Sequence, residues 1–350
     1  MNTPMCADMH PRKITRRAIG IRAPLAVALA VAFVAAGIAP GAAQDDKPLD
    51  PNNPYRVTLG TIPIAPLIPA FLAVEKGWFK DEGLEVELKP EPGGQDIVTA
   101  VVAQEFDFGF SNQTSLLIAR SRGLGVSAIA KAVVGSPDVE TAWDGVIVKI
   151  DSDIREATDL IGKTVSVNTL NNTPHMVLLR ALENAGVENP QEQVNFIEVQ
   201  FPDAVGAVNQ GQVDAAWVVE PFVTVGDMFG DTRVIMHPLI ETGPSFLMSA
   251  YFTSDKLIEQ RPDVVAAFTR AINKAMEFAS ENPQEVRDSF PKFNENANPK
   301  VAHSMALPFW NTTLSATDFE MGAELAKRYG FIDEIPDLEE FVKTPDKYGQ

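Results

Sequence analysis

The sequence predicts an α/β protein made of two α/β units followed by a helical C-terminal part. From Tyr55 onward, short apolar runs alternate with amphipathic stretches. The alternation starts again at Lys163, after a polar segment at 151–159, and from Leu257 the pattern is almost wholly helical. Strands that alternate with helices are typical of mainly parallel sheets, so we expect such sheets here.

The first unit contains predicted strands at 56–61, 84–88, 106–110, 126–134 and 145–150. A helix at 65–80 follows the first strand, and Gly83 ends that element. Gly93-Gly94 breaks the chain before a helix that continues to Val102. Ser111-Asn112 starts the next helix, because both residue types are favoured helix caps.

The second unit repeats this logic, with predicted strands at 163–168, 194–199, 213–219 and 233–236 and an extended segment at 246–253. Thr173-Pro174 begins a helix that runs through Ala185, since proline is favoured in a first turn. Asp203 is expected to cap a helix that ends at Gly211, and a further helix starts at Pro221.

The first 43 residues predict a secretory signal peptide. Basic residues between positions 12 and 22 precede an apolar run at 23–39, and Gly41 and Ala43 provide small residues for a cleavage site. The alternative is a retained membrane anchor. Pro24 and Gly37 interrupt the run, which favours cleavage near Ala43 and a periplasmic location.

Charge and cysteine content exclude several kinds of partner and site. The chain has 29 Lys+Arg against 47 Asp+Glu, a formal net charge of −18, which argues against nucleic acid and anionic membrane surfaces as partners. The single cysteine, Cys6, is lost with the signal peptide, so we expect no disulfide and no thiolate metal site. Thr15-Arg16-Arg17 resembles a twin-arginine signal, so the export route stays open.

Several stretches in order along the chain resemble the nitrate/sulfonate/taurine type of ABC transporter substrate-binding proteins. The similar segments are 70–86 (AFLAVEKGWFKDEGLEV), 104–109 (QEFDFG), 160–165 (LIGKTV), 211–217 with 220–222 (GQVDAAW and EPF), and 261–265 (RPDVV). Each segment alone is weak evidence, but five in register are strong evidence. Together they span about residues 55–290.

The resemblance implies a two-domain type II periplasmic binding protein with a ligand cleft between the domains. By analogy, 55–147 plus 252–345 form the first domain and 148–251 the second, with crossing strands at Gly145–Ile150 and Ala250–Ser254. It further implies a monomer without a cofactor that binds a small-molecule ligand, closes at a hinge and docks on the membrane subunits of an ABC importer.

In open α/β sheets, ligands lie beyond the carboxyl ends of the strands, so the polar strand-to-helix loops are the expected contacts. These loops lie at 62–66, 93–96, 111–114, 169–173 and 220–222. They and their surroundings supply the candidate ligand-binding residues Ile64, Gln95, Ser111, Asn112, Gln113, Trp143, Asn168, Asn171, Thr173, His175, Trp217 and Glu220.

Each candidate also has a structural explanation. Ser111, Asn112 and Thr173 are as well explained by helix capping, whereas Gln95, Gln113 and Asn171 are not obvious caps and are better ligand contacts. Trp217, like Phe110 and Phe222, fits a core position, and Trp143 either stacks on a flat ligand or packs at the hinge. Glu220 accepts hydrogen bonds from a ligand or forms an ion pair at the surface or hinge. His175 is either a contact or a packed side chain.

The sequence argues against an enzyme. His175, His237 and His303 form no metal-binding motif, and there is no nucleophile elbow, phosphate-binding loop or dinucleotide fingerprint. Two alternatives remain: an extracytoplasmic sensor or adaptor for a receptor, and an enzyme like the pyrimidine-forming proteins of fungal thiamine synthesis, whose cysteine-rich motif is absent here.

The ligand class is only weakly bounded. The loops of the first domain contain no Arg or Lys. An anion such as a sulfonate, taurine or a carboxylate would therefore depend on helix N-termini, whereas a neutral pyrimidine-like compound would stack on Trp or Phe. Glu220 slightly favours a ligand with an N–H donor.

Overall fold

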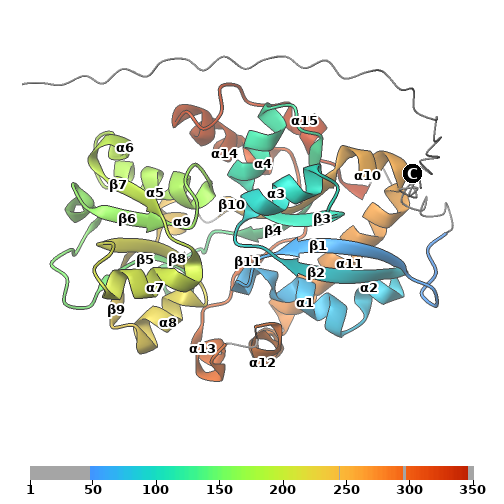
Figure 1. Cartoon of the computed structure of the whole chain (residues 1–350), viewed down its shortest axis with the longest axis horizontal. Coiled ribbons are helices and arrows are strands. Elements are labelled where there is room, and N and C mark those ends of the chain that lie inside the picture. Colours follow the sequence, from blue (N-terminus) through green and yellow to red (C-terminus); the bar gives the residue numbers. More distant parts are fainter. Residues whose placement is uncertain (1–47, 244, 295–296, 346–350) are drawn as a thin grey trace, which may run out of the picture. The chain divides into compact units, whose positions relative to one another are not determined.

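The computed structural model describes residues 48–243, 245–294 and 297–345; the predicted signal peptide at 1–43 lies outside these ranges. The predicted α/β class is confirmed, since the chain forms two sheets with helices packed around them (Figure 1). Both sheets are mixed, so the expectation of mainly parallel sheets was wrong. Strands β5 and β10 explain this, because each runs antiparallel to both of its neighbours.

The first sheet has six strands in the order β11-β4-β10-β3-β1-β2. Its N-terminal elements are β1 (Tyr55–Thr61), η1 (Ala65–Leu67), α1 (Ile68–Glu75), α2 (Trp78–Asp81), β2 (Leu84–Pro90), α3 (Gly94–Val102), β3 (Phe108–Asn112), α4 (Gln113–Ser121) and β4 (Val126–Val134). The helix expected at 65–80 is thus divided into three pieces. Gly77, in the left-handed conformation with φ 76°, separates α1 from α2.

The second sheet has five strands in the order β7-β6-β8-β5-β9. It comprises η2 (Val139–Thr141), β5 (Asp144–Lys149), η3 (Ala157–Leu160), β6 (Thr164–Val167), α5 (Thr173–Asn184), α6 (Pro190–Gln193), β7 (Asn195–Glu198), α7 (Phe201–Asn209), β8 (Ala215–Val219), α8 (Phe222–Phe229), β9 (Thr232–Met236) and α9 (Pro238–Thr242). Asp203 does not cap α7; the cap position is Gln200, and Asp203 lies in the first turn.

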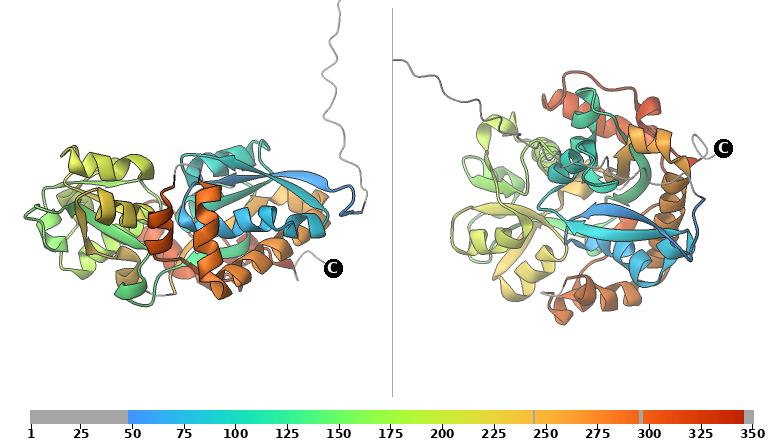
Figure 2. Two further views of the ribbon diagram at one scale, coloured as in Figure 1. Left: turned by 90° about the horizontal axis from the view of Figure 1, so that it is seen from below. Right: turned by 45° about the vertical axis from the view of Figure 1, so that its right-hand side comes forward.

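The chain returns to the first sheet and ends mostly in helices. These elements are β10 (Leu247–Ser254), α10 (Asp255–Gln260), α11 (Pro262–Glu281), α12 (Pro283–Phe293), α13 (Pro299–Ser304), β11 (Phe309–Trp310), α14 (Thr317–Arg328) and α15 (Leu338–Phe341). Seen from below, α12 and α13 lie along the junction of the two halves, and α13 contacts α8 of the second half (Figure 2). Within the described ranges, no helix combines the length and apolar character needed to cross a bilayer.

The chain changes sheets outside the strands that were expected to cross. Strand β5 lies wholly in the second sheet and β10 wholly in the first. The changes therefore occur in the segments 135–143 and 237–246. The predicted domain limits at 147/148 and 251/252 fall within β5 and β10, and the division into these two domains stays a prediction.

The core of the first half is built around Phe268 of α11. Its ring stacks on Phe108 of β3 at 3.9 Å between centroids and on Phe79 of α2 at 5.3 Å. Gly109 lies next to Phe108, and a Cβ there would meet the Phe252 ring at 2.3 Å and Ile97 at 2.6 Å. The sheet therefore requires glycine at this position for space.

We predict that Gly109→Ala lowers the free energy of unfolding by about 1–3 kcal/mol, because the added methyl group overpacks a rigid core. Gly206→Ala is the control, since a Cβ there lies 3.8 Å from its nearest neighbour and Gly206 is inside helix α7. That variant should gain about 0.5–1 kcal/mol from helix propensity. Denaturant unfolding measures both, and equal stabilities would contradict the packing described.

Candidate functional site

A narrow pocket lies between the two sheets and is lined by both halves of the chain. It encloses about 390 Å³ of space free of protein atoms, counting space open to solvent. Its lining residues are Ile62, Ile64, Pro66, Gly94, Phe110, Asn112, Val133, Trp143, Asn168, Asn172, Pro174, Phe201, Val219, Met248 and Ser249. None of these side chains is charged. The pocket is thus an apolar slot with a few amide and hydroxyl groups.

Strand ends place the polar groups. Asn112 is the last residue of β3, and Asn168 directly follows β6. Ser249 of β10 pairs with Asn112 in the sheet register. The Ser249 hydroxyl is buried and has no hydrogen-bond partner among the described residues. An unpaired buried hydroxyl at a pocket wall costs free energy unless a ligand or water binds it.

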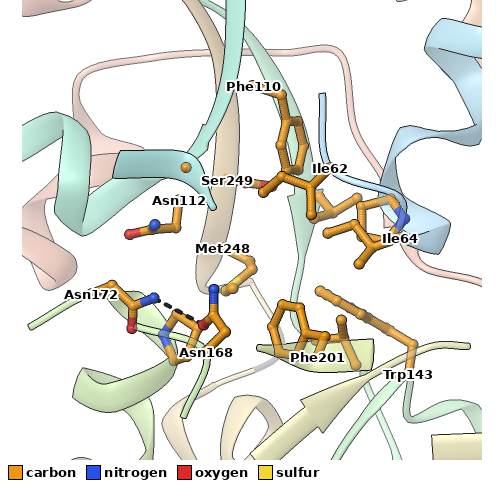
Figure 3. Close-up of a pocket in the computed structure, with 15 residues that line it drawn as sticks. Ile62, Ile64, Phe110, Asn112, Trp143, Asn168, Asn172, Phe201, Met248 and Ser249 are labelled. Carbon is orange, nitrogen blue, oxygen red and sulfur yellow. Dashed lines mark hydrogen bonds between the residues drawn. The ribbon is translucent and has the colours of Figure 1, made fainter. Parts of the chain in front are cut away.

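The asparagines also fix the two helix starts that face the pocket. Asn112 Oδ1 caps α4 by accepting from Ser115 N at 3.0 Å, and it accepts from Thr173 N and Thr173 Oγ1 at 3.1 Å each. Asn172 caps α5 by accepting from His175 N at 3.1 Å and donates to Asn168 Oδ1 at 3.0 Å (Figure 3). One asparagine therefore joins helices from both halves, and another holds Asn168 in place.

Aromatic side chains form the opposite side of the pocket, where Figure 3 shows Trp143 and Phe201 across from the asparagines. Trp143 is fully buried, and its indole N–H donates to the Val134 carbonyl at 3.2 Å. This bond ties the start of β5 to the end of β4 across the first connecting segment. Trp143 therefore both packs at the connection and lines the pocket.

Four of the predicted residues line the pocket, namely Ile64, Asn112, Trp143 and Asn168. Thr173 lies beside it, joined through its hydroxyl to Asn112 and to the Thr114 hydroxyl at 2.8 Å. Thr173 does not cap α5, because Asn172 holds that position. Contact of these residues with a ligand stays a prediction.

The other predicted residues lie outside the lining. Ser111 belongs to β3 rather than to a cap, and its buried hydroxyl sits against Gly94. Gln113 is buried in α4 and donates to the Leu247 carbonyl. The exposed Gln95 donates across to the Leu170 carbonyl at 3.5 Å. Trp217 is buried in β8, where its indole N–H donates to Asp144 Oδ2 at 3.2 Å.

His175 and Asn171 form a local unit at the start of α5. The exposed Asn171 donates its backbone N–H to His175 Nδ1 at 3.1 Å. The imidazole packs against Phe196 of the second sheet and Phe331 of the C-terminal part, at 4.6 and 5.4 Å between centroids. Burial lowers the pKa of His175 to about 4, so the side chain is neutral and acts as a packed ring near pH 7.

Glu220 is buried at the junction of the two halves. Its carboxylate accepts from Thr224 Oγ1 at 2.8 Å, Thr224 N at 3.1 Å and Ala306 N at 3.1 Å. Its carbonyl accepts from Ala65 N at 3.1 Å. Both carboxylate oxygens are therefore satisfied by the protein, and Glu220 is not part of the pocket lining.

Sequence reasoning missed Asn172, Phe201, Met248 and Ser249 as lining residues. Asn172 carried a usable signal, since an asparagine directly before Thr173-Pro174 is a favoured cap. Ser249 carried none, because a serine inside an extended run has no distinguishing pattern. In the described part of the chain, no group of three or more His, Cys, Asp or Glu side chains could hold a metal ion.

Residues 65–286, more than half of the chain, match the family described as NMT1/THI5 like. The chain belongs to this family. This confirms the resemblance to sulfonate- and taurine-type binding proteins. The formylaminopyrimidine-binding protein of Halalkalibacterium halodurans is 27% identical over 279 residues, 78% of this chain and 79% of that protein. The taurine-binding periplasmic protein of Escherichia coli is 26% identical, over 69% of this chain and 70% of that protein.

Solved structures of such proteins share the fold. The alkanesulfonate-binding protein SsuA from Xanthomonas axonopodis pv. citri, bound to MOPS, superposes with a TM-score of 0.70 at 17% identity, covering 83% of this chain and 99% of that one. The desulfurization enzyme DSZB superposes with a TM-score of 0.60 at 15% identity, covering 83% and 96%. The fold alone therefore does not separate binding from catalysis.

Burial raises the pKa of Glu220 from its ordinary value of 4.5 to about 7, so folding favours the protonated carboxyl group. That contribution is fully present below about pH 4.5 and is lost as the pH rises through 7. We predict that Glu220→Gln removes this dependence. The wild type should lose on the order of 2–3 kcal/mol relative to the variant between these pH values.

Denaturant unfolding at several pH values measures this difference. The exposed Glu259→Gln variant is the control and should follow the wild-type curve, since Glu259 lies on α10 away from the junction. Parallel curves for wild type and Glu220→Gln would show that this carboxyl group does not titrate differently on folding.

Proposed function

We propose that this protein is the solute-binding component of an ABC importer, which captures a small organic molecule by closing two domains around it. The observation that carries the proposal is a pocket lined from both sheets at the carboxyl ends of their strands. The related proteins of known name are binding proteins for formylaminopyrimidine and taurine. The captured molecule is accordingly a sulfonate- or taurine-like compound or a pyrimidine-like one.

Direct contacts between the halves support closure at the two connecting segments. The Thr114 and Thr173 hydroxyls lie 2.8 Å apart, Gln95 donates to Leu170, and Ala65 donates to Glu220. An open form would break these contacts. A ligand that touches both walls adds free energy only to the closed form and therefore shifts the population toward it. The closed form then docks on the membrane subunits.

The pocket chemistry favours binding over catalysis. Its lining contains no Asp, Glu, His, Cys, Lys or Arg side chain. Ser249 is the one hydroxyl among the lining residues, and no base within the described ranges activates it. Nucleophilic catalysis by serine requires an adjacent general base. We therefore propose a protein without catalytic activity.

We further propose that the protein is exported and that its signal peptide is removed. The chain isolated from the periplasmic fraction should begin at Gln44, because Gly41 and Ala43 supply the small residues before the cut. N-terminal sequencing of that fraction measures this. An intact N-terminus in the membrane fraction would support the retained anchor instead.

The proposed function predicts that the purified protein carries or accepts one small molecule per chain. Mass spectrometry of compounds released on denaturation identifies it, and a thermal-shift assay tests its return. A ligand at ~100 times its Kd adds about 2.7 kcal/mol to stability. A chain that releases nothing, and that is unmoved by sulfonates, carboxylates, amines and pyrimidines, would favour the sensor or adaptor function.

Asn168→Ala should weaken binding of that molecule by about tenfold or more, because a buried amide partner is lost. Asn195→Ala is the matched control, since Asn195 is exposed on β7 and its side-chain amide donates to Thr164 Oγ1 at 3.2 Å. Calorimetric titration of both variants measures the effect. Equal affinities for the two variants would remove Asn168 from the site.

A further inference from the structure

A second hollow, which we call the proline annex, adjoins the pocket. The two share Ile62, Ile64 and Phe201 in their linings, so they lie side by side at these three residues. The annex holds about 690 Å³ free of protein atoms, counting space open to solvent. A ligand that extends from the asparagines past these three residues enters this space.

The annex wall is poor in hydrogen-bond donors. Four of its residues are prolines, which have no backbone N–H: Pro63, Pro90, Pro92 and Pro202. Phe222 adds an apolar ring that lies nearly parallel to Phe201, at 18° and 6.1 Å between centroids. An anionic group placed against these prolines would lose water without gaining backbone N–H partners from them, which is costly.

The polar groups of the annex are acceptors. Glu91 contributes a carboxylate. Gln200 donates its amide N–H to the Asn168 carbonyl at 3.1 Å, while its Oε1 is buried with no partner in the described residues. Because both free groups accept hydrogen bonds, the matching ligand group is an N–H donor.

Two buried carboxyl groups lie directly next to lining residues. Asp144 follows Trp143, and Glu220 follows Val219. Uncharged donors hold both, among them Leu239 N at 3.1 Å from Asp144 Oδ2 and Ala306 N at 3.1 Å from Glu220 Oε1. Burial raises the pKa of each to about 7, so both groups are partly ionised near neutral pH. The lining of the pocket itself supplies no lysine or arginine to balance the charge of an anion.

We propose, on the basis of the function proposed above, that the ligand is a neutral or cationic nitrogen compound rather than an anion. Its polar head meets Asn112, Asn168 and Ser249. Its apolar part lies in the proline annex and carries an N–H donor toward Gln200 and Glu91. The class includes aryl carboxamides, amino-substituted heteroaromatics and arylalkylamines.

Matched pairs of probes test the charge of the ligand. Benzenesulfonamide against benzenesulfonate and benzamide against benzoate differ in charge at similar size. We expect the amide members to bind at least about tenfold tighter in calorimetric titrations, and taurine to give no thermal shift. Tighter binding of the sulfonate or carboxylate would overturn the ligand class while leaving the importer function intact, since the N-terminus of α3 would then hold the anion.

The molecule released from the purified protein gives a second, independent result. A released compound without negative charge supports the proposal, and a released sulfonate or carboxylate overturns it. A protein that releases nothing and binds none of the probes would overturn the importer function itself, and the ligand class with it.

Charge reversal in the annex tests the position of the N–H donor. Glu91→Lys should weaken binding of the tightest nitrogen compound by about fivefold or more. Glu87→Lys is the control, since Glu87 is an exposed residue of β2 that lies outside the annex and pairs with Lys89. Its affinity should stay within about twofold of wild type. Equal effects of both changes, or tighter binding by Glu91→Lys, would place the ligand elsewhere.

Discussion

The geometry of the pocket depends on the junction between Asn112 and Thr173. Asn112 Oδ1 accepts from Ser115 N in the first turn of α4 and from the backbone N–H and hydroxyl of Thr173 at the start of α5. One buried oxygen thus sets the distance between a helix of the first half and a helix of the second. Because such a buried acceptor is costly to leave unpaired, separation of the halves must replace these bonds with water or ligand.

The two buried carboxyl groups, those of Asp144 and Glu220, also depend on neutral hydrogen-bond partners. Asp144 begins β5 directly after the first connecting segment, and Glu220 follows β8 and accepts hydrogen bonds from Ala65 and Ala306. Each carboxyl group is held by neutral donors. Charged partners would make these junctions harder to break, since removing one member of a buried ion pair leaves an uncompensated charge. Neutral donors can be exchanged for water at lower cost. This arrangement suits a protein whose halves separate and rejoin.

The sequence predicted the order of strands and helices well because each element carries its own period of apolar residues. Strand β4 was predicted with its observed bounds, because the mostly apolar run at 126–134 lies between Gly125 and Gly135. Sheet membership was predicted less well. Nothing local in 145–150 or 250–254 tells which neighbours those strands pair with, since pairing depends on residues far away in the chain.

The candidate site was predicted in part, for the same reason. Asn112 and Asn168 follow from the rule that ligands lie beyond strand ends, but Ser249 enters the site only through its pairing opposite Asn112. Glu220 sits in a strand-to-helix loop as expected, yet the C-terminal segment at Ala306 covers it. The rule that strand-to-helix loops contact the ligand cannot anticipate this contact, because Ala306 lies 86 residues further along the chain than Glu220.

Selectivity in such a pocket comes from the hydrogen bonds that its walls cannot provide. Apolar walls distinguish ligands of similar size by only about 1–3 kcal/mol, whereas a polar group left without a partner is rejected far more strongly. The four prolines of the annex offer no N–H, and Gln200 Oε1 and Glu91 offer only acceptors. An oxyanion that reaches these groups gives up its water without gaining a hydrogen bond from them. In the proposed site, such walls would discriminate chiefly through the cost of unpaired charge, and the asparagines would orient the ligand.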